Sequence, residues 1–268
     1  QKETDIMSYL TRNHPAPGLH VLITAGASGI GAEMARAFLE AGARVAICDI
    51  DEAVLARFAG EHPEVLTAVA DVSDEAAVTR LIEKVGGAFG KLDVLVNNAG
   101  VSGPTGLIED LDIAEIRRTL EVDLLSQYIV LKAAVPLMKK SGPGSVINVS
   151  SVAGRLGYAM RTPYSGSKWG IVGVSASLAK ELGPHGIRVN AVLPGIVRGE
   201  RINNVISDRA VAAGITFDEM EERLLSHVSL RRMVDAEDVA AMVLFLCSPG
   251  GSSISGQALS VCGNVETL

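Results

Sequence analysis

Short apolar strands alternate with amphipathic helices along almost the whole chain. Runs of Val, Ile, Leu and other strand-forming residues lie at 20–24, 44–48, 65–70, 93–96, 145–149, 187–192 and 258–261. Strands that are apolar at nearly every position are typical of a parallel sheet buried on both faces. The pattern therefore predicts one α/β domain, with a doubly wound and mostly parallel sheet of seven strands and helices on both faces.

Helical patterns occupy most of the segments between these strands. They cover residues 30–41, 52–60, 74–88, 112–139, about 164–182 and 235–247. In the third of these, Ala77, Leu81, Ile82 and Val85 share one face, as an amphipathic helix requires. Pro136 lies inside the fourth and is expected to disturb it. Residues 199–232 are the least regular part of the chain.

Composition argues against several classes of partner. Of the 268 residues 48% are hydrophobic, but no apolar run reaches the roughly 18–20 residues that span a bilayer. Lys and Arg number 24 against 31 Asp and Glu, so the net charge is −7. An acidic surface disfavours non-specific binding to nucleic acids. We therefore expect neither a membrane nor a nucleic acid as partner.

The cysteines and the N-terminal segment indicate a cytoplasmic protein. Cys48, Cys247 and Cys262 are odd in number, widely spaced and set in apolar runs. Buried free thiols are therefore expected, with no disulfide and no metal site. Residues 1–18 are polar and form an N-terminal extension without the apolar core of a signal peptide. The first residue is glutamine, and Met7 is expected to be the natural start.

A glycine-rich turn joins the first strand to its helix. Residues 24–31 read Thr-Ala-Gly-Ala-Ser-Gly-Ile-Gly and open directly into the helical pattern. Such glycines let the backbone approach a pyrophosphate, and the helix N-terminus offers free N–H groups to it. A tight turn without a ligand would use similar residues. The candidate cofactor contacts here are Gly26, Ser28, Gly29, Ile30 and Gly31.

Asp49 favours the nucleotide interpretation. An acid at the end of the second strand can accept hydrogen bonds from both ribose hydroxyls of an adenosine, and it would repel a 2′-phosphate. The glycine loop contains no Lys or Arg, and the residue after Asp49 is the apolar Ile50. NAD is therefore expected rather than NADP.

Asp71 and Val72 follow the third strand, and two interpretations of them stay open. Asp71 is either a turn or helix-cap residue, because Ser73 and Asp74 come next, or its side chain and the adjacent backbone reach the adenine.

Tyr164 and Lys168 are the candidate catalytic pair. They lie four positions apart at the start of a helix, so they share one face. A tyrosine ordinarily ionises at about pH 10, and an adjacent ammonium favours its phenolate, which can then act as a general base. A Tyr-x-x-x-Lys pair also arises by chance, and serines often end strands. With Ser151 at the end of the fifth strand, however, the pair could remove a proton from an alcohol while a cofactor takes the hydride.

Together these motifs resemble the short-chain dehydrogenase/reductase family, over essentially the whole chain from about residue 20. The glycine loop is similar to the family's Thr-Gly-x-x-x-Gly-x-Gly. Asn-Asn-Ala-Gly at 97–100 matches a motif beside the adenosine ribose, and the Pro-Gly turn at 194–195 matches one beside the nicotinamide. Ser151, Tyr164 and Lys168 match the catalytic set in order and spacing. The resemblance adds as cofactor contacts Asn98, Ala99, Gly100, Tyr164, Lys168, Pro194, Gly195 and Ile196.

The resemblance implies an oxidoreductase that transfers a hydride between NAD and a secondary alcohol or ketone. Tyr164 would exchange a proton with the substrate oxygen, Ser151 would hydrogen-bond that oxygen, and Lys168 would assist the tyrosine and hold the nicotinamide ribose. It also implies a Rossmann-type catalytic domain over residues 19–268, with a mobile substrate lid at about 199–232. The alternatives are a 3-oxoacyl-thioester reductase, which would usually prefer NADPH, and an NAD-sensing protein without catalysis.

A homotetramer is a further implication of the resemblance. The two helices at 112–139 and 164–182 carry apolar residues on more than one face, which supports burial against partner subunits. The residues named for this contact are Val130, Val135, Leu137, Ile171, Val174 and Leu178.

The sequence departs from the family pattern at several positions. Ala25 replaces the first glycine of the loop, and its small methyl is expected to be tolerated. Asp123 stands where the family usually has the Asn of a catalytic tetrad. In the family this Asn supports a water that leads to the lysine, and an ionised Asp123 could still accept a hydrogen bond from that water, so Asp123 is a further catalytic candidate. Its charge would, however, cancel part of the lysine's effect on Tyr164. The alternative is an ordinary polar helix residue that faces away. Gly199 stands where a threonine often contacts the nicotinamide amide, and Val-Cys-Gly-Asn at 261–264 replaces the usual Val-Asp-Gly-Gly.

Residues near the expected substrate site do not name the substrate. The apolar lid residues either pack the lid onto the domain or line the site; they are Ile202, Val205, Ile206, Met220, Leu224, Leu225 and Val228. Tyr158 and Met160 are lining candidates by position. Four arginines are either solvated or available to an anionic substrate, namely Arg155, Arg161, Arg198 and Arg201.

Overall fold

The centre of the molecule is a sheet of seven parallel strands. The structure is a computed structural model and describes residues 9–266. The strands are β1 (His20–Thr24), β2 (Arg44–Asp49), β3 (Leu66–Val69), β4 (Val94–Asn97), β5 (Gly144–Val149), β6 (Ile187–Pro194) and β7 (Ala258–Val261). They lie in the order β3-β2-β1-β4-β5-β6-β7, with every neighbouring pair parallel. The predicted doubly wound sheet is confirmed, and the strand order reverses between β1 and β4, where such sheets open a ligand crevice.

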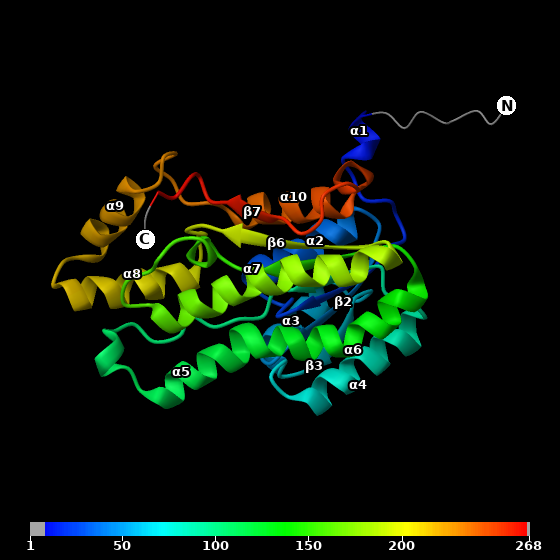
Figure 1. Ribbon diagram of the computed structural model, residues 1–268, viewed down its shortest axis with the longest axis horizontal. Coiled ribbons are helices and arrows are strands. Elements are labelled where there is room, and N and C mark those ends of the chain that lie inside the picture. Colours follow the sequence, from blue (N-terminus) through cyan, green and yellow to red (C-terminus); the bar gives the residue numbers. More distant parts are fainter. Residues whose placement is uncertain (1–8, 267–268) are drawn as a thin grey trace.

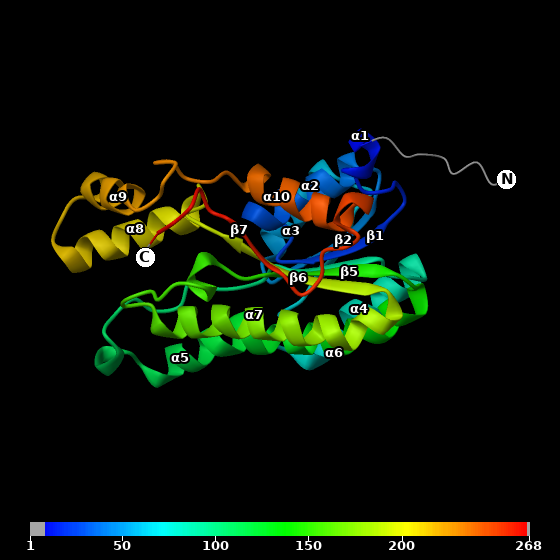
Figure 2. The ribbon, with the colours of Figure 1, turned by 45° about the horizontal axis from the view of Figure 1, so that its top comes forward.

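Helices cover both faces of this sheet (Figures 1 and 2). One face is covered by α2 (Gly29–Glu40), α3 (Glu52–Glu61) and α10 (Ala236–Cys247). The other is covered by α4 (Glu75–Phe89), α6 (Ser126–Ser141) and α7 (Thr162–Leu182). In Figure 2 the first group lies above the sheet and the second below it. A short helix, α1 (Tyr9–Arg12), precedes β1.

Each central strand contributes side chains to two separate cores. Val21 and Ile23 of β1 pack among α2, α3 and α10, whereas Leu22 between them packs among α4, α6 and α7. All three are fully buried. This is why the strands are apolar at successive positions rather than at alternate ones.

Three helices, α3, α4 and α5, begin at aspartates that serve as N-caps. Asp51 accepts hydrogen bonds from the backbone N–H groups of Ala53 and Val54 at the start of α3. Asp74 caps α4 and Asp112 caps α5 (Ile113–Leu120) in the same manner. These carboxylates satisfy N–H groups that a helix start leaves without partners.

The predicted helix at 112–139 is interrupted by a π-helical turn. It consists of α5, the π turn Glu121–Leu125 and α6, which continues through Pro136 to Ser141. A π turn often marks a functional site, and this one contains Asp123.

The segment 199–232 is more regular than predicted. It folds into α8 (Glu200–Ala213) and α9 (Phe217–Ser226), which extend past the end of the sheet in Figure 1. Thr216 and Glu219 form a capping box at the start of α9. Ile206, Met220 and Leu224 are buried in a third apolar cluster that also contains Val152 and Ile196. Apolar faces on both helices therefore hold this segment against the end of the sheet.

The six residues predicted to contact partner subunits belong to the core of this chain. Val130, Ile171 and Val174 are buried, and Val135, Leu137 and Leu178 pack against the same cluster. The prediction was wrong for the three buried residues, because helices that cover a parallel sheet bury a wide apolar stripe. For the three partly buried residues it stays a prediction. Other apolar residues of the same long helices are exposed: Leu125 at 50%, Tyr128 at 51% and Trp169 at 52%.

Three further findings concern the described residues as a set. No helix within residues 9–266 has the length and apolarity of a transmembrane span. Among the same residues no group of three or more His, Cys, Asp or Glu side chains is arranged to bind a metal ion. Cys48, Cys247 and Cys262 are free thiols, and burial raises the pKa of Cys48 and of Cys247 to about 12.

Candidate active site

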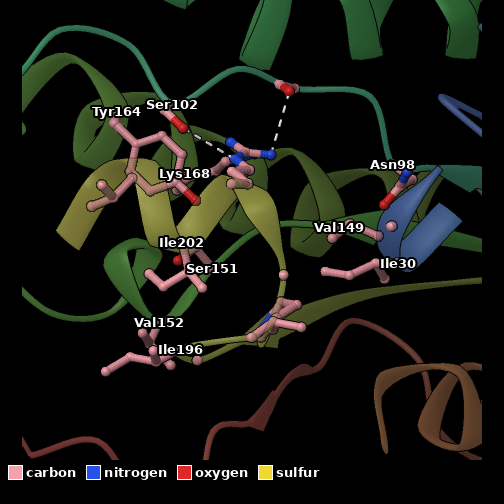
Figure 3. Close-up of a pocket in the computed structure, with 18 of the residues that line it drawn as sticks. Ile30, Asn98, Ser102, Val149, Ser151, Val152, Tyr164, Lys168, Ile196 and Ile202 are labelled. Carbon is pink, nitrogen blue, oxygen red and sulfur yellow. Dashed lines mark hydrogen bonds between the residues drawn. The ribbon is translucent and has the colours of Figure 1, made fainter. Parts of the chain in front are cut away.

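A cavity of about 610 Å³ lies at the carboxyl ends of the central strands. Figure 3 shows it between the end of β5, the first turns of α7 and the start of α8. Of the residues predicted for the site, it is lined by Ser28, Gly29, Ile30, Asn98, Gly100, Ser151, Tyr164, Lys168, Pro194, Gly195 and Ile196. The position agrees with the crevice expected where the strand order reverses.

Tyr164 and Lys168 lie together in the first turns of α7. Lys168 Nζ is 5.4 Å from the centre of the Tyr164 ring. The lysine side chain is almost completely buried, and its backbone carbonyl accepts a hydrogen bond from Ser150 Oγ at 2.7 Å. The i, i+4 spacing predicted this juxtaposition, and the buried stem keeps the ammonium on the tyrosine side of the helix.

Ser151 faces the same cavity from the end of β5. It is the N-cap of the short 3₁₀ helix Val152–Gly154, where its Oγ accepts a hydrogen bond from the Ala153 N–H at 3.1 Å. The hydroxyl hydrogen is not used in that contact. Ser151 can therefore donate to an oxygen atom held between it and Tyr164.

Asp123 is completely buried behind Lys168. Its Oδ1 accepts a hydrogen bond from the Val101 N–H at 2.6 Å, and its Oδ2 accepts one from Ser167 Oγ at 3.2 Å. The same Oδ2 lies 3.8 Å from Lys168 Nζ. The alternative of a polar residue that faces away from the site is therefore wrong. The carboxylate contacts the ammonium directly, although it does not line the cavity.

The glycines of the first loop have different tasks. A Cβ at Gly31 would collide with the Ala25 carbonyl, and one at Gly26 would come 2.6 Å from the Ile47 side chain. These two glycines allow close packing of the loop, its helix and the neighbouring strand. Gly29 has φ +51° and open space on its Cβ side, and it lines the cavity. Among the loop's glycines, Gly29 is therefore the one placed for a ligand to approach.

Ala25 occupies the left-handed region, with φ +48°. Its carbonyl accepts a hydrogen bond from the Asn98 side-chain amide at 3.0 Å, and Asn98 also bonds the Thr24 carbonyl at 3.1 Å. The Ala99 N–H donates to Thr24 Oγ1 at 3.0 Å. The Asn-Asn-Ala-Gly segment thus ties the end of β4 to the end of β1. These contacts hold the loop in a conformation that alanine seldom adopts.

Asp49 is buried at the end of β2, next to the glycine loop. Its Oδ2 accepts a hydrogen bond from the Ala27 N–H at 3.3 Å, and its Oδ1 accepts one from the Asp51 N–H at 3.2 Å. Ile50 beside it is 61% exposed. Neither residue lines the cavity, and the contact of Asp49 and Ile50 with a cofactor stays a prediction.

Asp71 and Val72 lie outside the cavity as well. Asp71 accepts hydrogen bonds from the backbone and hydroxyl of Ser73 and pairs with Arg118 at 3.3 Å. Burial raises its pKa, but the Ser73 and Arg118 contacts outweigh burial and hold the pKa below the ordinary value. Val72 is buried in the core. The Asp71 side chain therefore forms the turn and also joins β3 to α5, and a contact of this segment with adenine stays a prediction.

The backbone conformation at residue 199 explains why glycine replaces the family's threonine there. Its backbone has φ +146° and ψ 176°, a combination that residues with a side chain rarely adopt. A threonine would be strained at this position, immediately before α8.

The four predicted arginines have different environments. Arg155 is exposed and bonds β7, with its Nη2 2.6 Å from the Ala258 carbonyl. Arg198 is exposed and pairs with Asp235 at 3.1 Å. Arg201 is exposed and lines the cavity. Arg161 is 2% exposed and also lines the cavity, so the solvated interpretation is wrong for it.

Several lining residues had no sequence signal of their own. They include Ser102, Val149, Ser150, Val152 and Asn204. Tyr158 lines the cavity as predicted, whereas Met160 is not among its lining residues. Arg209, which donates a hydrogen bond to the Tyr158 hydroxyl at 3.3 Å, was missed. Of the lid residues, Ile202 and Val205 line the cavity.

Comparison with known proteins assigns the chain to a family. A family model described as enoyl-(acyl carrier protein) reductase matches residues 24–264. Trans-4-hydroxycyclohexanecarboxylate dehydrogenase of Sinomonas cyclohexanicum is 36% identical over 252 residues, which cover 90% of each chain. The chain belongs to the short-chain dehydrogenase/reductase family.

Solved structures of other proteins are also similar to this short-chain dehydrogenase/reductase. A crystal structure of an actinorhodin polyketide ketoreductase variant with NADPH has a TM-score of 0.89 and 32% identity, and the match covers 94% of this chain and 98% of that one. The NAD⁺-bound xylitol dehydrogenase has a TM-score of 0.89 and 26% identity, with 92% and 98% covered. The chain is thus similar to dehydrogenases and ketoreductases, and the prediction of an oxidoreductase is confirmed.

Proposed function

We propose that this oxidoreductase transfers a hydride between NAD and the carbinol carbon of a secondary alcohol, or the reverse for the corresponding ketone. The observation that carries the proposal is the convergence of Ser151, Tyr164 and Lys168 on one cavity, which also receives the glycine loop. The relative from Sinomonas cyclohexanicum is named for oxidation of a ring-borne secondary alcohol, which supports this substrate class.

The glycine end of the cavity fits a dinucleotide. Helix α2 begins at Gly29, and its N-cap Ser28 makes no side-chain hydrogen bond to the first turn. The free N–H groups and the open space at Gly29 suit a pyrophosphate. Asp49 would hold the adenosine ribose, while Lys168 and Tyr164 would hold the ribose at the nicotinamide end. When bound, the nicotinamide supplies the hydride acceptor or donor.

Asp49 supports NAD in preference to NADP. Its carboxylate is already fixed by the Ala27 and Asp51 N–H groups, so it cannot turn away from an incoming 2′-phosphate without losing both hydrogen bonds. The described structure shows no arginine or lysine bonded to it. A fixed, uncompensated carboxylate repels the phosphate and accepts from ribose hydroxyls.

The proton steps belong to this chain's own residues. Ser151 donates a hydrogen bond to the substrate oxygen and orients it against Tyr164. In oxidation the Tyr164 phenolate accepts the alcohol proton, and in reduction the phenol returns a proton to the ketone oxygen. The buried Lys168 ammonium stabilises the phenolate and is itself held by Asp123. Fixed positions of these groups lower the barrier because little reorganisation is needed.

A screen of secondary alcohols tests the proposal. The protein is mixed with NAD or NADP and a panel of linear, cyclic and acidic secondary alcohols, and NADH formation is followed by fluorescence. Turnover with NAD is expected for some members. Cofactor binding without turnover of any alcohol or ketone would favour the NAD-sensing alternative, and a clear preference for oxoacyl thioesters with NADPH would favour the thioester reductase.

We also propose a cytoplasmic homotetramer with residues 199–232 as a substrate lid on the 19–268 domain. Exposed apolar side chains on the long helices, Leu125, Tyr128 and Trp169, support association. The packing of α8 and α9 supports the proposal of a lid, because these helices pack in the third apolar cluster, which is separate from the two cores of the sheet. Three free cysteines suit a reducing compartment.

A further inference from the structure

Three arginines surround the two tyrosines of the cavity. The Arg161 guanidinium carbon lies 5.2 Å from the centre of the Tyr164 ring and 5.4 Å from that of Tyr158. The Arg201 carbon lies 6.0 Å from the Tyr164 ring, and the Arg209 carbon lies 5.3 Å from the Tyr158 ring. Two cations, Arg161 and Arg201, therefore lie over the Tyr164 ring, and a third, Arg209, lies over the neighbouring Tyr158 ring.

Arg161 and Arg201 are directed to the same residue, Ser102. A terminal nitrogen of Arg161 donates to the Ser102 carbonyl, and Arg201 Nε donates to Ser102 Oγ at 3.1 Å. Figure 3 draws the hydrogen bond that reaches Ser102 Oγ, close to Tyr164. Arg201 also reaches the Gly100 carbonyl at 3.4 Å. The shared partner brings two like charges together at the wall of the cavity.

Arg161 is buried with part of its hydrogen-bonding capacity unused. It is 2% exposed, and its Nε has no hydrogen-bond partner among residues 9–266. Burial is the main reason that the pKa of its guanidinium is lowered. The nearby Tyr158 and Tyr164 oppose that change, whereas the Arg201 and Arg209 charges add to it. A buried cation that other cations repel is costly unless an anion joins it.

The chain does not supply that anion within its described part. Arg161, Arg201 and Arg209 form no ion pair with any carboxylate of residues 9–266. Glu200 lines the cavity but is exposed and makes no such pair. Arg198, in contrast, also lines the cavity and is neutralised by Asp235 at 3.1 Å.

We propose that Arg161 and Arg201 form a carboxylate-binding subsite, so that the substrate is a secondary alcohol or ketone that also carries a carboxylate. The proposal rests on the proposed function, because it assumes that the carbinol oxygen lies at Tyr164. Guanidinium groups bind planar carboxylates through paired N–H donors.

Two other uses of the arginines make different predictions. If Arg161 only stacks against Tyr164, its loss lowers turnover equally for charged and neutral substrates. If Arg201 serves a cofactor phosphate, its loss raises the KM for the cofactor. A carboxylate subsite instead changes the preference between an acid and its neutral counterpart, with little change in the KM for the cofactor.

Matched substrates and variants test the subsite. We would compare kcat/KM for 4-hydroxycyclohexanecarboxylate and for its carboxamide, which has a similar shape and no charge, and repeat this with a linear hydroxycarboxylate pair. Wild type should prefer the acids by about tenfold or more, as the loss of one charged hydrogen-bonded contact implies. Arg201→Met and Arg161→Met should each abolish this preference for the acid. Arg161→Lys, which keeps a positive charge, should retain part of the preference that Arg161→Met loses. Arg198→Met should keep the wild-type preference.

A binding measurement separates failure of the subsite from failure of the proposed function. Calorimetry on cofactor-free protein compares cyclohexanecarboxylate, cyclohexanecarboxamide and inorganic phosphate. The carboxylate should bind at least about tenfold more tightly than the amide, and Arg201→Met, an exposed change that leaves the buried Arg161 in place, should remove that difference. Equal binding of acid and amide, tighter binding of phosphate, or oxidation of neutral alcohols as fast as of acids would overturn the subsite while the dehydrogenase assignment stands. Selective carboxylate binding without any alcohol oxidation would instead reject the proposed function.

Discussion

Asp123 Oδ2 lies 3.8 Å from Lys168 Nζ, and both side chains are almost inaccessible to solvent. The Lys168 ammonium therefore lies near both the Tyr164 ring and the Asp123 carboxylate. A carboxylate so close to the lysine stabilises the ammonium. It also offsets part of the positive field that the lysine exerts on the tyrosine.

Replacement of Asp123 with Asn should shift the pH dependence of oxidation. The amide oxygen can still accept a hydrogen bond from the Val101 N–H, but the negative charge beside Lys168 is lost. The phenolate of Tyr164 is then less disfavoured, so the acidic limb of the kcat profile should move to lower pH. The measurement is kcat for NAD-linked oxidation across the pH range in which the protein stays folded.

Glu121→Gln is the matched control for this variant. It removes a carboxylate from the same π-helical turn, at a half-buried position that is not paired with Lys168. Its profile should coincide with that of wild type. An Asp123→Asn profile identical to wild type would mean that the carboxylate serves packing alone, and its assignment as a positioning residue would then be withdrawn.

Tyr164→Phe should retain cofactor binding and lose nearly all turnover. The ring still packs beside Arg161 and Lys168, but the group that exchanges a proton with the substrate oxygen is gone. The expected fall in kcat is about 10²–10⁴-fold, the usual contribution of general acid–base catalysis. Tyr158→Phe, which removes a hydroxyl from the neighbouring wall, should have a far smaller effect. More than about a tenth of wild-type kcat in Tyr164→Phe would reject the assignment.

Asp49→Ser should shift cofactor preference toward NADP. The variant removes both the repulsion of a 2′-phosphate and the acceptor for the ribose hydroxyls. The ratio of kcat/KM for NADP to that for NAD should rise by about tenfold or more, equivalent to roughly 1.4 kcal/mol. Asp51→Asn is the control, because it removes a carboxylate two residues away and keeps an N-cap for α3. A wild-type protein that already uses NADP as well as NAD would contradict the argument.

Trp169→Arg should reduce the size of the assembly. Trp169 is 52% exposed on α7, the helix that also carries the proposed catalytic pair. An arginine there would place a charge in the apolar contact proposed between subunits. Light scattering at micromolar concentration should show a tetramer for wild type and a smaller species for the variant. Val211→Arg, at a position that is 83% exposed on α8, is the control and should remain a tetramer. A monomeric wild type would refute the proposal.

Local spacing predicted the parts of the fold and site that depend on neighbouring residues. Leu22 and its flanking Val21 and Ile23 showed a strand buried on both faces, because each fills a different core. Tyr164 and Lys168 could be paired from sequence because four helical residues return the chain to the same face. Gly29 and Gly31 could be assigned to the loop, but their separate tasks required the positions of the Ala25 carbonyl and the helix.

Tertiary contacts decided what spacing could not. Arg161 is buried, and its hydrogen bond goes to the carbonyl of Ser102, 59 residues earlier in the chain, a contact that no local pattern shows. The π turn at Glu121–Leu125 has the composition of an ordinary helix, yet it directs Asp123 toward Lys168. Val130 and Ile171 could be recognised as apolar, but which core or interface they fill depended on the packing of the helices on the sheet.

Asp93 should make stability depend on pH in the acid range. It is buried at the start of β4, where its Oδ2 accepts hydrogen bonds from the His20 N–H at 2.8 Å and pairs with Lys91 at 3.0 Å. Burial raises its pKa, but the contacts with His20 and Lys91 outweigh burial, so the folded-state pKa is below the ordinary value. The unfolded chain then binds the proton more readily than the folded chain does.

The stabilisation from Asp93 is therefore complete above the pKa of an unfolded aspartate, about 3.9, and is lost as the pH falls through the lower folded value. Asp93→Asn should lower the free energy of unfolding at pH 7, and the gap between variant and wild type should narrow as the pH falls below about 4. Urea unfolding at a series of pH values, followed by circular dichroism, measures both quantities. A gap that stays constant down to the acid transition would show that Asp93 contributes packing and neutral hydrogen bonds rather than a charge held by His20 and Lys91.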